Sequence, residues 1–161
     1  GKCREGLRSR AAWLTDETGT RGTDMILITA LDDGGGMAFH GRRQSMDRIL
    51  RERVLALCGG AVLWMSSYTR RQFSEDPGNV RIRVAEDFLD RAQAGEFCFA
   101  EICSLSAAKP ERLILFRWNR AYPADLRFDL PDFPAQWHCI QRLDFPGTSH
   151  PQITQEVYER A

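Results

Sequence analysis

An anion site is the first chemistry that the sequence suggests, at Arg42, Arg43 and Gln44. Two guanidinium groups beside the free N–H groups of a helix N-terminus provide donors and positive charge for a phosphate or a carboxylate. The alternative is a solvated basic loop whose arginines pair with Asp32 and Asp33, because runs of charge are usually solvated. The sequence leaves both interpretations open.

A carboxylate follows this loop, at Asp47. In a desolvated pocket it could anchor a heterocyclic substrate or relay a proton to it. The alternative is an acidic residue in the first turn of a helix, where the helix dipole favours negative charge. We expect Ser45 to cap this helix, which the apolar pattern places over residues 46–57.

Other catalytic or metal chemistry finds little support in the residue spacing. The three glycines at residues 34–36 lack the spacing of a dinucleotide fingerprint or a P-loop, so we predict a mobile loop over residues 34–41. His150 has no partner nearby in the sequence, and we expect it to be exposed in a turn. The five cysteines are irregularly spaced, which argues against a metal site and favours a reduced, cytoplasmic protein.

Length and composition are typical of one globular domain. The chain has 161 residues, of which 43% are hydrophobic, and this suffices for a buried core. Its 22 basic and 22 acidic residues give zero net charge, which argues against nucleic acid as the partner. No apolar run reaches the roughly 20 residues that a membrane helix needs. We interpret residues 1–24 as a polar, weakly ordered leader and residues 25–161 as a single α/β domain.

Strands and helices alternate through the first part of this domain, and strands alone follow. The predicted strands cover residues 25–31, 61–65, 80–84, 97–102, 112–118, 137–145 and 152–158, and the predicted helices cover residues 46–57, 69–73 and 86–94. Strands separated by helices form parallel sheets, whereas strands joined by turns run antiparallel. The order therefore predicts a three-layer α/β domain with a mixed, mainly parallel sheet and an antiparallel C-terminal edge.

This order of elements, with several residues in it, resembles dihydrofolate reductase. The run at residues 25–31 resembles the first strand of that family, with Ala30 at its substrate-facing alanine. Asp47 is similar in place to its substrate-binding carboxylate, and Thr69 to the threonine after its second strand. The resemblance covers residues 25–161. It implies the fold of that family, a pterin-like substrate and NADPH as the cofactor.

The sequence departs from the family where the cofactor would bind. The arginine that contacts the cofactor's 2′-phosphate would fall at Ser67, and the adjacent glycine at Ser66. The Gly-Gly turn under the dinucleotide phosphates would fall near Glu101, whose negative charge would face those phosphates. The family threonine on the later strand would be Arg117. We therefore leave the cofactor unassigned, with NADPH as the one that the resemblance implies.

Three functions remain open. The first is a dihydrofolate-reductase-like domain that binds an anionic, nucleotide-like or pterin-like small molecule without redox chemistry. The second is an oxidoreductase, an NAD(P)H-dependent reductase of a pterin-like heterocycle, in which Asp47 anchors the substrate and residues 34–41 close over it. The third is a protein- or RNA-interaction module that uses the basic loop. The candidate ligand contacts are Ala30, Arg42, Arg43, Gln44, Ser66, Ser67, Thr69 and Arg117.

Overall fold

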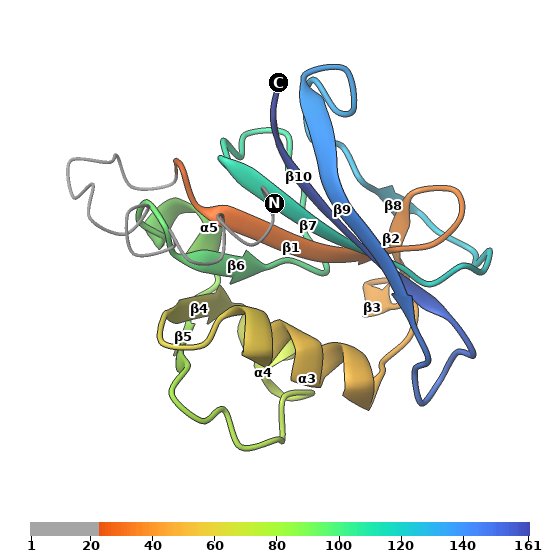
Figure 1. Ribbon diagram of the computed structural model, residues 1–161, viewed down its shortest axis with the longest axis horizontal. Helices are drawn as coiled ribbons and strands as arrows, with labels where there is room; N and C mark the ends of the chain where they lie inside the picture. Colours follow the sequence, from red (N-terminus) through yellow and green to blue (C-terminus); the bar gives the residue numbers. More distant parts are fainter. Residues whose placement is uncertain (1–22) are drawn as a thin grey trace.

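The computed structural model describes residues 23–161, so nearly all of the leader expected over residues 1–24 lies outside the described residues. Its largest element is a seven-stranded sheet (Figure 1). From one edge to the other, the strands are β5 (Arg81–Val84), β4 (Val62–Met65), β6 (Phe97–Phe99), β1 (Ile26–Leu31), β7 (Arg112–Arg117), β10 (Ile153–Arg160) and β9 (Trp137–Phe145).

The five strands from β5 to β7 run parallel, and the C-terminal pair forms the antiparallel edge. β1 pairs with β6 on one side and with β7 on the other, in register from Ile26 opposite Arg112 to Leu31 opposite Arg117. β10 is antiparallel to both β7 and β9. These pairings confirm the predicted mixed, mainly parallel sheet. β1 can occupy a central place because its continuous apolar run is buried on both faces.

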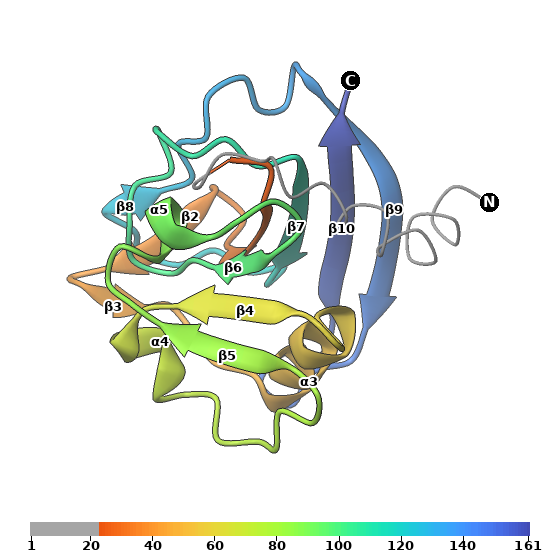
Figure 2. The same ribbon diagram turned by 90° about the vertical axis from the view of Figure 1, so that its left-hand side faces the viewer.

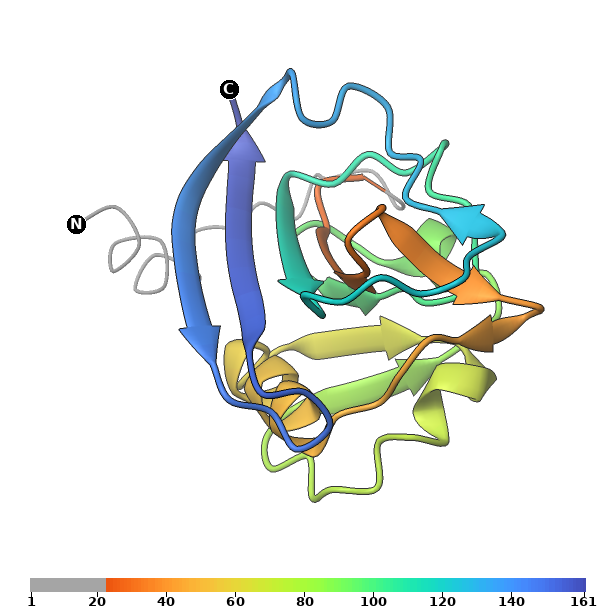
Figure 3. The same cartoon turned by 90° about the vertical axis from the view of Figure 1, so that its right-hand side faces the viewer.

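Short elements cover the two faces of the sheet. On one face lie α3 (Arg48–Leu57) and α4 (Ser67–Arg70), and α4 stands at the carboxyl end of β4 (Figure 2). On the other face lie α5 (Phe88–Arg91) and a small sheet of β3 (Arg42–Arg43), β2 (Gly36–Phe39) and β8 (Leu126–Arg127) (Figure 3). Within residues 23–161, no helix is long and apolar enough to cross a membrane.

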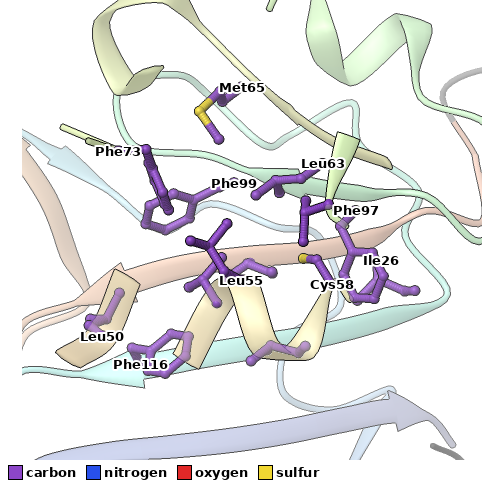
Figure 4. Packing of buried hydrophobic residues seen from close by; sticks show 14 of the residues in the cluster. Ile26, Leu50, Leu55, Cys58, Leu63, Met65, Phe73, Phe97, Phe99 and Phe116 are labelled. Carbon is purple, nitrogen blue, oxygen red and sulfur yellow. The ribbon is translucent and has the colours of Figure 1, made fainter. Parts of the chain in front are cut away.

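A hydrophobic core fixes α3 against the sheet. Leu50 and Leu55 of α3, with the C-cap residue Cys58, lie among Phe97 and Phe116 of the strands (Figure 4). Burial of one such side chain stabilises the fold by roughly 1.5–3 kcal/mol. This packing places the start of α3, with residue 47, beside the carboxyl end of the central strands.

The structure corrects the predicted start of the first helix. α3 begins at Arg48 with Asp47 as its N-cap, because the Asp47 carboxylate accepts the Leu50 N–H. Ser45 therefore precedes the helix and does not cap it. The helix expected over residues 86–94 is limited to α5, since its N-cap makes no side-chain bond and Ala92 is already extended.

The glycine segment is also more ordered than predicted, because residues 36–39 form β2. Asp32 starts this strand by accepting the N–H groups of Gly34 at 2.8 Å and Gly36 at 2.6 Å. Gly36 is required at this point, since a Cβ would lie 2.6 Å from the Cβ of Ala124. The small sheet that β2 forms was not predicted, because its outer strands have only two residues each.

Candidate functional site

A cluster of hydrogen-bond donors converges on the carboxylate of Glu101, which follows β6 at the carboxyl end of the parallel strands. Arg43 of β3 donates to it twice, from Nε at 2.9 Å and from Nη2 at 3.1 Å. Thr69 Oγ1 and Gln72 Nε2 each donate at 2.8 Å. The Arg43 guanidinium also lies 4.2 Å from the centre of the Tyr68 ring. Charge-assisted bonds of this kind are about twice as strong as neutral ones, so the donors hold Glu101 firmly.

The structure separates the three residues of the predicted anion site. Arg43 points into the Glu101 cluster, whereas Arg42 is exposed on β3. Gln44 donates from Nε2 to Asp32 Oδ2 at 3.0 Å, and Asp32 is further engaged by the N–H groups of the glycine turn. Arg43 alone of the three therefore bonds the Glu101 carboxylate.

The cleft beside Ala30, where the resemblance to dihydrofolate reductase implies a substrate, is closed. A cavity of about 10 Å³ lies there, which is room for about one water molecule. Gln44 Oε1 is buried without a hydrogen-bond partner, and a bridging water would satisfy it. The cavity is lined by Ala30, Met37, Arg43, Gln44, Ser45, Ala100, Glu101 and Trp118.

Asp47 is buried, and both of its carboxylate oxygens accept hydrogen bonds from the protein. Its Oδ1 accepts the Leu50 N–H at 3.0 Å, and its Oδ2 accepts the N–H and the hydroxyl of Ser149 at 2.6 and 2.7 Å. Burial by itself would raise the pKa of Asp47, but these bonds, with one from Thr148, outweigh burial and hold the pKa below its usual value. The carboxylate is therefore ionised at neutral pH. Its catalytic role stays a prediction.

His150 is buried, which corrects the expectation of an exposed turn histidine. The residue is 4% exposed, and its ring stacks on Trp118 with the ring centres 4.7 Å apart. Nδ1 lies 2.7 Å from Ser149 Oγ, and Nε2 lies 2.7 Å from Tyr122 Oη. Burial is the main cause that lowers the pKa of His150. The turn between β9 and β10 thus fills the space beside the N-terminus of α3.

Ser66 and Ser67 also bind groups of the protein itself. Ser66 Oγ caps α4 by accepting the Thr69 N–H at 3.2 Å. Ser67 donates to Glu86 Oε2 from its backbone N at 3.0 Å and from Oγ at 2.8 Å. The bond from the Ser67 N–H is the main cause that holds the pKa of Glu86 below its usual value. A carboxylate therefore occupies the donors of Ser67, the position at which the resemblance placed the phosphate-binding arginine.

Arg117 lies on the face of the sheet opposite α3. Side chains alternate along a strand, and its neighbour Phe116 belongs to the core under α3. Arg117 Nε pairs with Glu156 Oε1 at 3.0 Å. Arg142 Nε and Tyr158 Oη bond the same carboxylate at 3.1 and 2.9 Å. The structure therefore does not bring Arg117 together with the other predicted ligand contacts.

An open pocket of about 270 Å³ lies beside the Glu101 cluster. Glu101 belongs to the cluster and also faces this pocket. Burial and the nearby Asp129 raise the pKa of Cys103 to about 11, so the thiol in the pocket is protonated at neutral pH. In the part of the chain that the structure describes, no group of His, Cys, Asp and Glu could hold a metal ion. The pocket is lined by Gly41, Ser66, Tyr68, Glu86, Phe88, Glu101, Ile102 and Cys103.

A comparison with solved structures identifies the architecture. The chain is similar to dihydrofolate reductase from Enterococcus faecalis, solved in complex with NADP(H) and RAB-propyl, with a TM-score of 0.57. The two are 11% identical, and the match covers 88% of this chain and 98% of that chain. The domain has the fold of dihydrofolate reductase. At this identity the likeness shows the fold alone, and neither a protein-family model nor a curated protein matches the sequence.

Sequence reasoning missed the contacts that shape this site. It identified Glu101 as a departure from the family pattern but not as the partner of Arg43. Ser149, His150 and Tyr122 gave no signal, because Ser149 meets Asp47 across 102 residues and Tyr122 meets His150 across 28. Contacts between such distant segments depend on the fold of the whole chain.

Proposed function

We propose that this dihydrofolate-reductase-like domain binds an anionic small molecule without redox chemistry. The anionic group of the ligand takes the position of the Glu101 carboxylate on Arg43, Thr69 and Gln72. The rest of the ligand lies in the adjoining pocket of about 270 Å³. One observation supports this proposal above all others: donors from separate segments point at one anionic position beside an open pocket.

The position of Glu101 makes such an exchange feasible. The residue lies in a bend directly after β6, and its side chain already faces the open pocket. A ligand carboxylate or phosphate would form the same charge-assisted bonds that Glu101 gives up. The cost is a lower apparent affinity, because the donors are available only in the fraction of molecules from which Glu101 has withdrawn.

A pterin-like ligand and a nicotinamide dinucleotide fit these residues poorly. The cavity of about 10 Å³ next to Ala30 has no room for a heterocycle. Glu86 and Glu101 place negative charge on the donors that dinucleotide phosphates would need. We therefore derive no hydride transfer, and NADPH is retained only as a ligand to be tested.

Calorimetric titration tests the proposal with four probes: inorganic phosphate, pyrophosphate, NADPH and NADH. Glu101→Gln removes the internal charge that competes with the ligand, so it should strengthen phosphate or pyrophosphate binding at least about tenfold, the effect of 1.4 kcal/mol. Arg43→Ala should abolish binding in either background. Absence of anion binding in both the wild type and Glu101→Gln would sink the proposal.

Two further variants separate this site from general electrostatic attraction. Arg48→Ala removes an exposed arginine of α3 whose charge is paired with Glu52, so anion binding should be unchanged. Arg42→Ala removes the exposed arginine of β3 and tests the interaction-module alternative, because RNA or an acidic protein would require that side chain. An NADPH-dependent absorbance change with a pterin substrate would favour the reductase alternative instead.

A further inference from the structure

A continuous chain of hydrogen bonds joins three segments of the fold. Asp47 Oδ2, at the N-cap of α3, lies 2.7 Å from Ser149 Oγ, which lies 2.7 Å from His150 Nδ1. His150 Nε2 lies 2.7 Å from Tyr122 Oη, in the connection between β7 and β8. Figure 3 shows the β9–β10 turn beside the start of α3. We name these four side chains the His150 chain.

The chemistry of the groups determines where each proton lies. The ionised Asp47 carboxylate only accepts, so the hydroxyl proton of Ser149 points to it. Ser149 Oγ then accepts from His150, which places the ring proton on Nδ1. His150 Nε2 is left to accept the hydroxyl proton of Tyr122. With a neutral His150, every donor in the chain has an acceptor.

The same turn closes the substrate side of the cleft. Trp118 lines the small cavity together with Ala30, and it stacks on His150. Gly147 lies so close to α3 that a Cβ there would collide with the Asp47 carboxylate. If the turn moved away, Trp118 would lose its stacking partner and Asp47 would lose the hydrogen bonds that it accepts from Ser149 and Thr148. A movement of the turn away from α3 therefore requires that the His150 chain breaks.

We propose that His150 is a proton-controlled latch: its protonation releases the β9–β10 turn from α3 and opens the substrate side of the cleft. Protonation adds an N–H at Nε2, where the hydroxyl proton of Tyr122 already lies. Two protons cannot occupy this position, so either the Tyr122 hydroxyl rotates away or the His150 imidazole leaves its place in the chain. In the released turn the imidazolium is hydrated. Its charge then carries no cost of burial, and the proton on Nε2 no longer meets the hydroxyl proton of Tyr122.

Charged groups on the neighbouring segments act on His150 in opposite directions. Burial is the largest influence, and it disfavours the imidazolium. Arg120, 5.7 Å from the Tyr122 ring, also disfavours the imidazolium, whereas Asp47 favours it. Asp32 approaches from the end of β1, where its Oδ2 accepts the Tyr122 N–H at 3.2 Å. The net result is a lowered pKa of His150 in the closed turn. Acid therefore favours the released turn.

Wild-type protein alone provides the first test. An NMR titration from pH 8 to pH 5 follows the His150 ring protons. Amide hydrogen exchange, corrected for its intrinsic pH dependence, gives the opening constant of residues 147–151. We expect the opening constant to rise as pH falls below the ordinary pKa of 6.5, by at most about tenfold per pH unit because one proton is linked. Opening that does not follow the titration of His150 overturns the proposal.

Variants sharpen this test. His150→Phe keeps an aromatic ring against Trp118 but cannot titrate, so its opening should be independent of pH in this window. Tyr122→Phe removes the hydroxyl that competes with the added proton at Nε2, so the closed turn tolerates the imidazolium and the opening constant should rise less in acid than in the wild type. His138→Gln, at an exposed position of β9, is the matched control with a wild-type profile. An unchanged profile in His150→Phe and Tyr122→Phe would refute the latch, whatever the outcome for anion binding.

Discussion

Arg43 and Glu101, 58 residues apart in the sequence, form a two-point ion pair that joins β3 to the segment after β6. The two side chains are only 17% and 10% exposed. The loss of one partner therefore leaves the other charge partly buried without compensation. The pair connects the small sheet to the main sheet, and both side chains also line the small cavity beside Ala30.

The first prediction concerns the stability that this ion pair provides. Glu101→Leu should lower the free energy of unfolding by about 2 kcal/mol, because Arg43 is left buried without its partner. Urea unfolding followed by circular dichroism measures the loss. Glu52→Ala breaks the pair of Arg48 and Glu52, which are 52% and 48% exposed, and should cost only about 0.5 kcal/mol. Equal losses in the two variants would contradict the structural role of Glu101.

The second prediction separates the capping role of Asp47 from a catalytic one. Asp47→Asn keeps an acceptor for the Leu50 N–H but turns an NH2 group towards the two donors of Ser149. The free energy of unfolding should fall by about 1–3 kcal/mol, the cost of buried polar groups without partners. Thermal unfolding checks this. A variant of wild-type stability that has lost a pterin-dependent activity would instead support the catalytic prediction.

The third prediction concerns the stability of the fold in acid. Asp47 and His150 both have pKa values lowered by folding, so the unfolded chain binds more protons in acid and stability rises with pH. The His150 contribution is complete above pH 6.5 and is lost as pH falls towards its folded pKa. The Asp47 contribution is complete above pH 3.8 and is lost as pH falls through its lower folded pKa. Urea midpoints between pH 8 and pH 3 should therefore fall in two stages, and His150→Phe should remove only the upper one.

The fourth prediction excludes Arg117 from the ligand site. Arg117→Met should leave anion binding unchanged, because its guanidinium pairs with Glu156 of β10 and not with Glu101. Unfolding should become easier by about 1 kcal/mol, since Glu156 loses one charge-assisted bond but keeps Arg142 and Tyr158. Calorimetry and urea unfolding give the two values. Weaker anion binding in this variant would return Arg117 to the site.

The fold was largely predictable from local patterns. The apolar run of β1 indicated a strand buried on both faces, and the alternation of arginine with apolar residues in β5 indicated an edge strand, as the structure has them. The boundaries of β9 were also correct. These features depend on neighbours within one segment, so the sequence is sufficient to predict them.

The site was less predictable, because it depends on pairings between segments. Arg43 is a typical surface residue in sequence terms, and only the approach of β3 to the end of β6 gives it a carboxylate partner. His150 is buried because the β9–β10 turn folds onto α3, which no property of the turn itself indicates. Asp47 was expected inside the helix, yet it lies one residue before it and caps it.

The carboxylate that satisfies the donors around Arg43 is tethered, because Glu101 is part of the same chain. A free ligand stabilises a protein in proportion to its own supply, whereas a tethered group has a fixed effective concentration. The donors around Arg43 are therefore satisfied even in a cell that is depleted of ligand, and the domain should have the same melting temperature in scarcity as in moderate supply. An external anion displaces Glu101 only above a threshold concentration. The site would therefore bind the anion at high concentration and stay unoccupied at trace concentration.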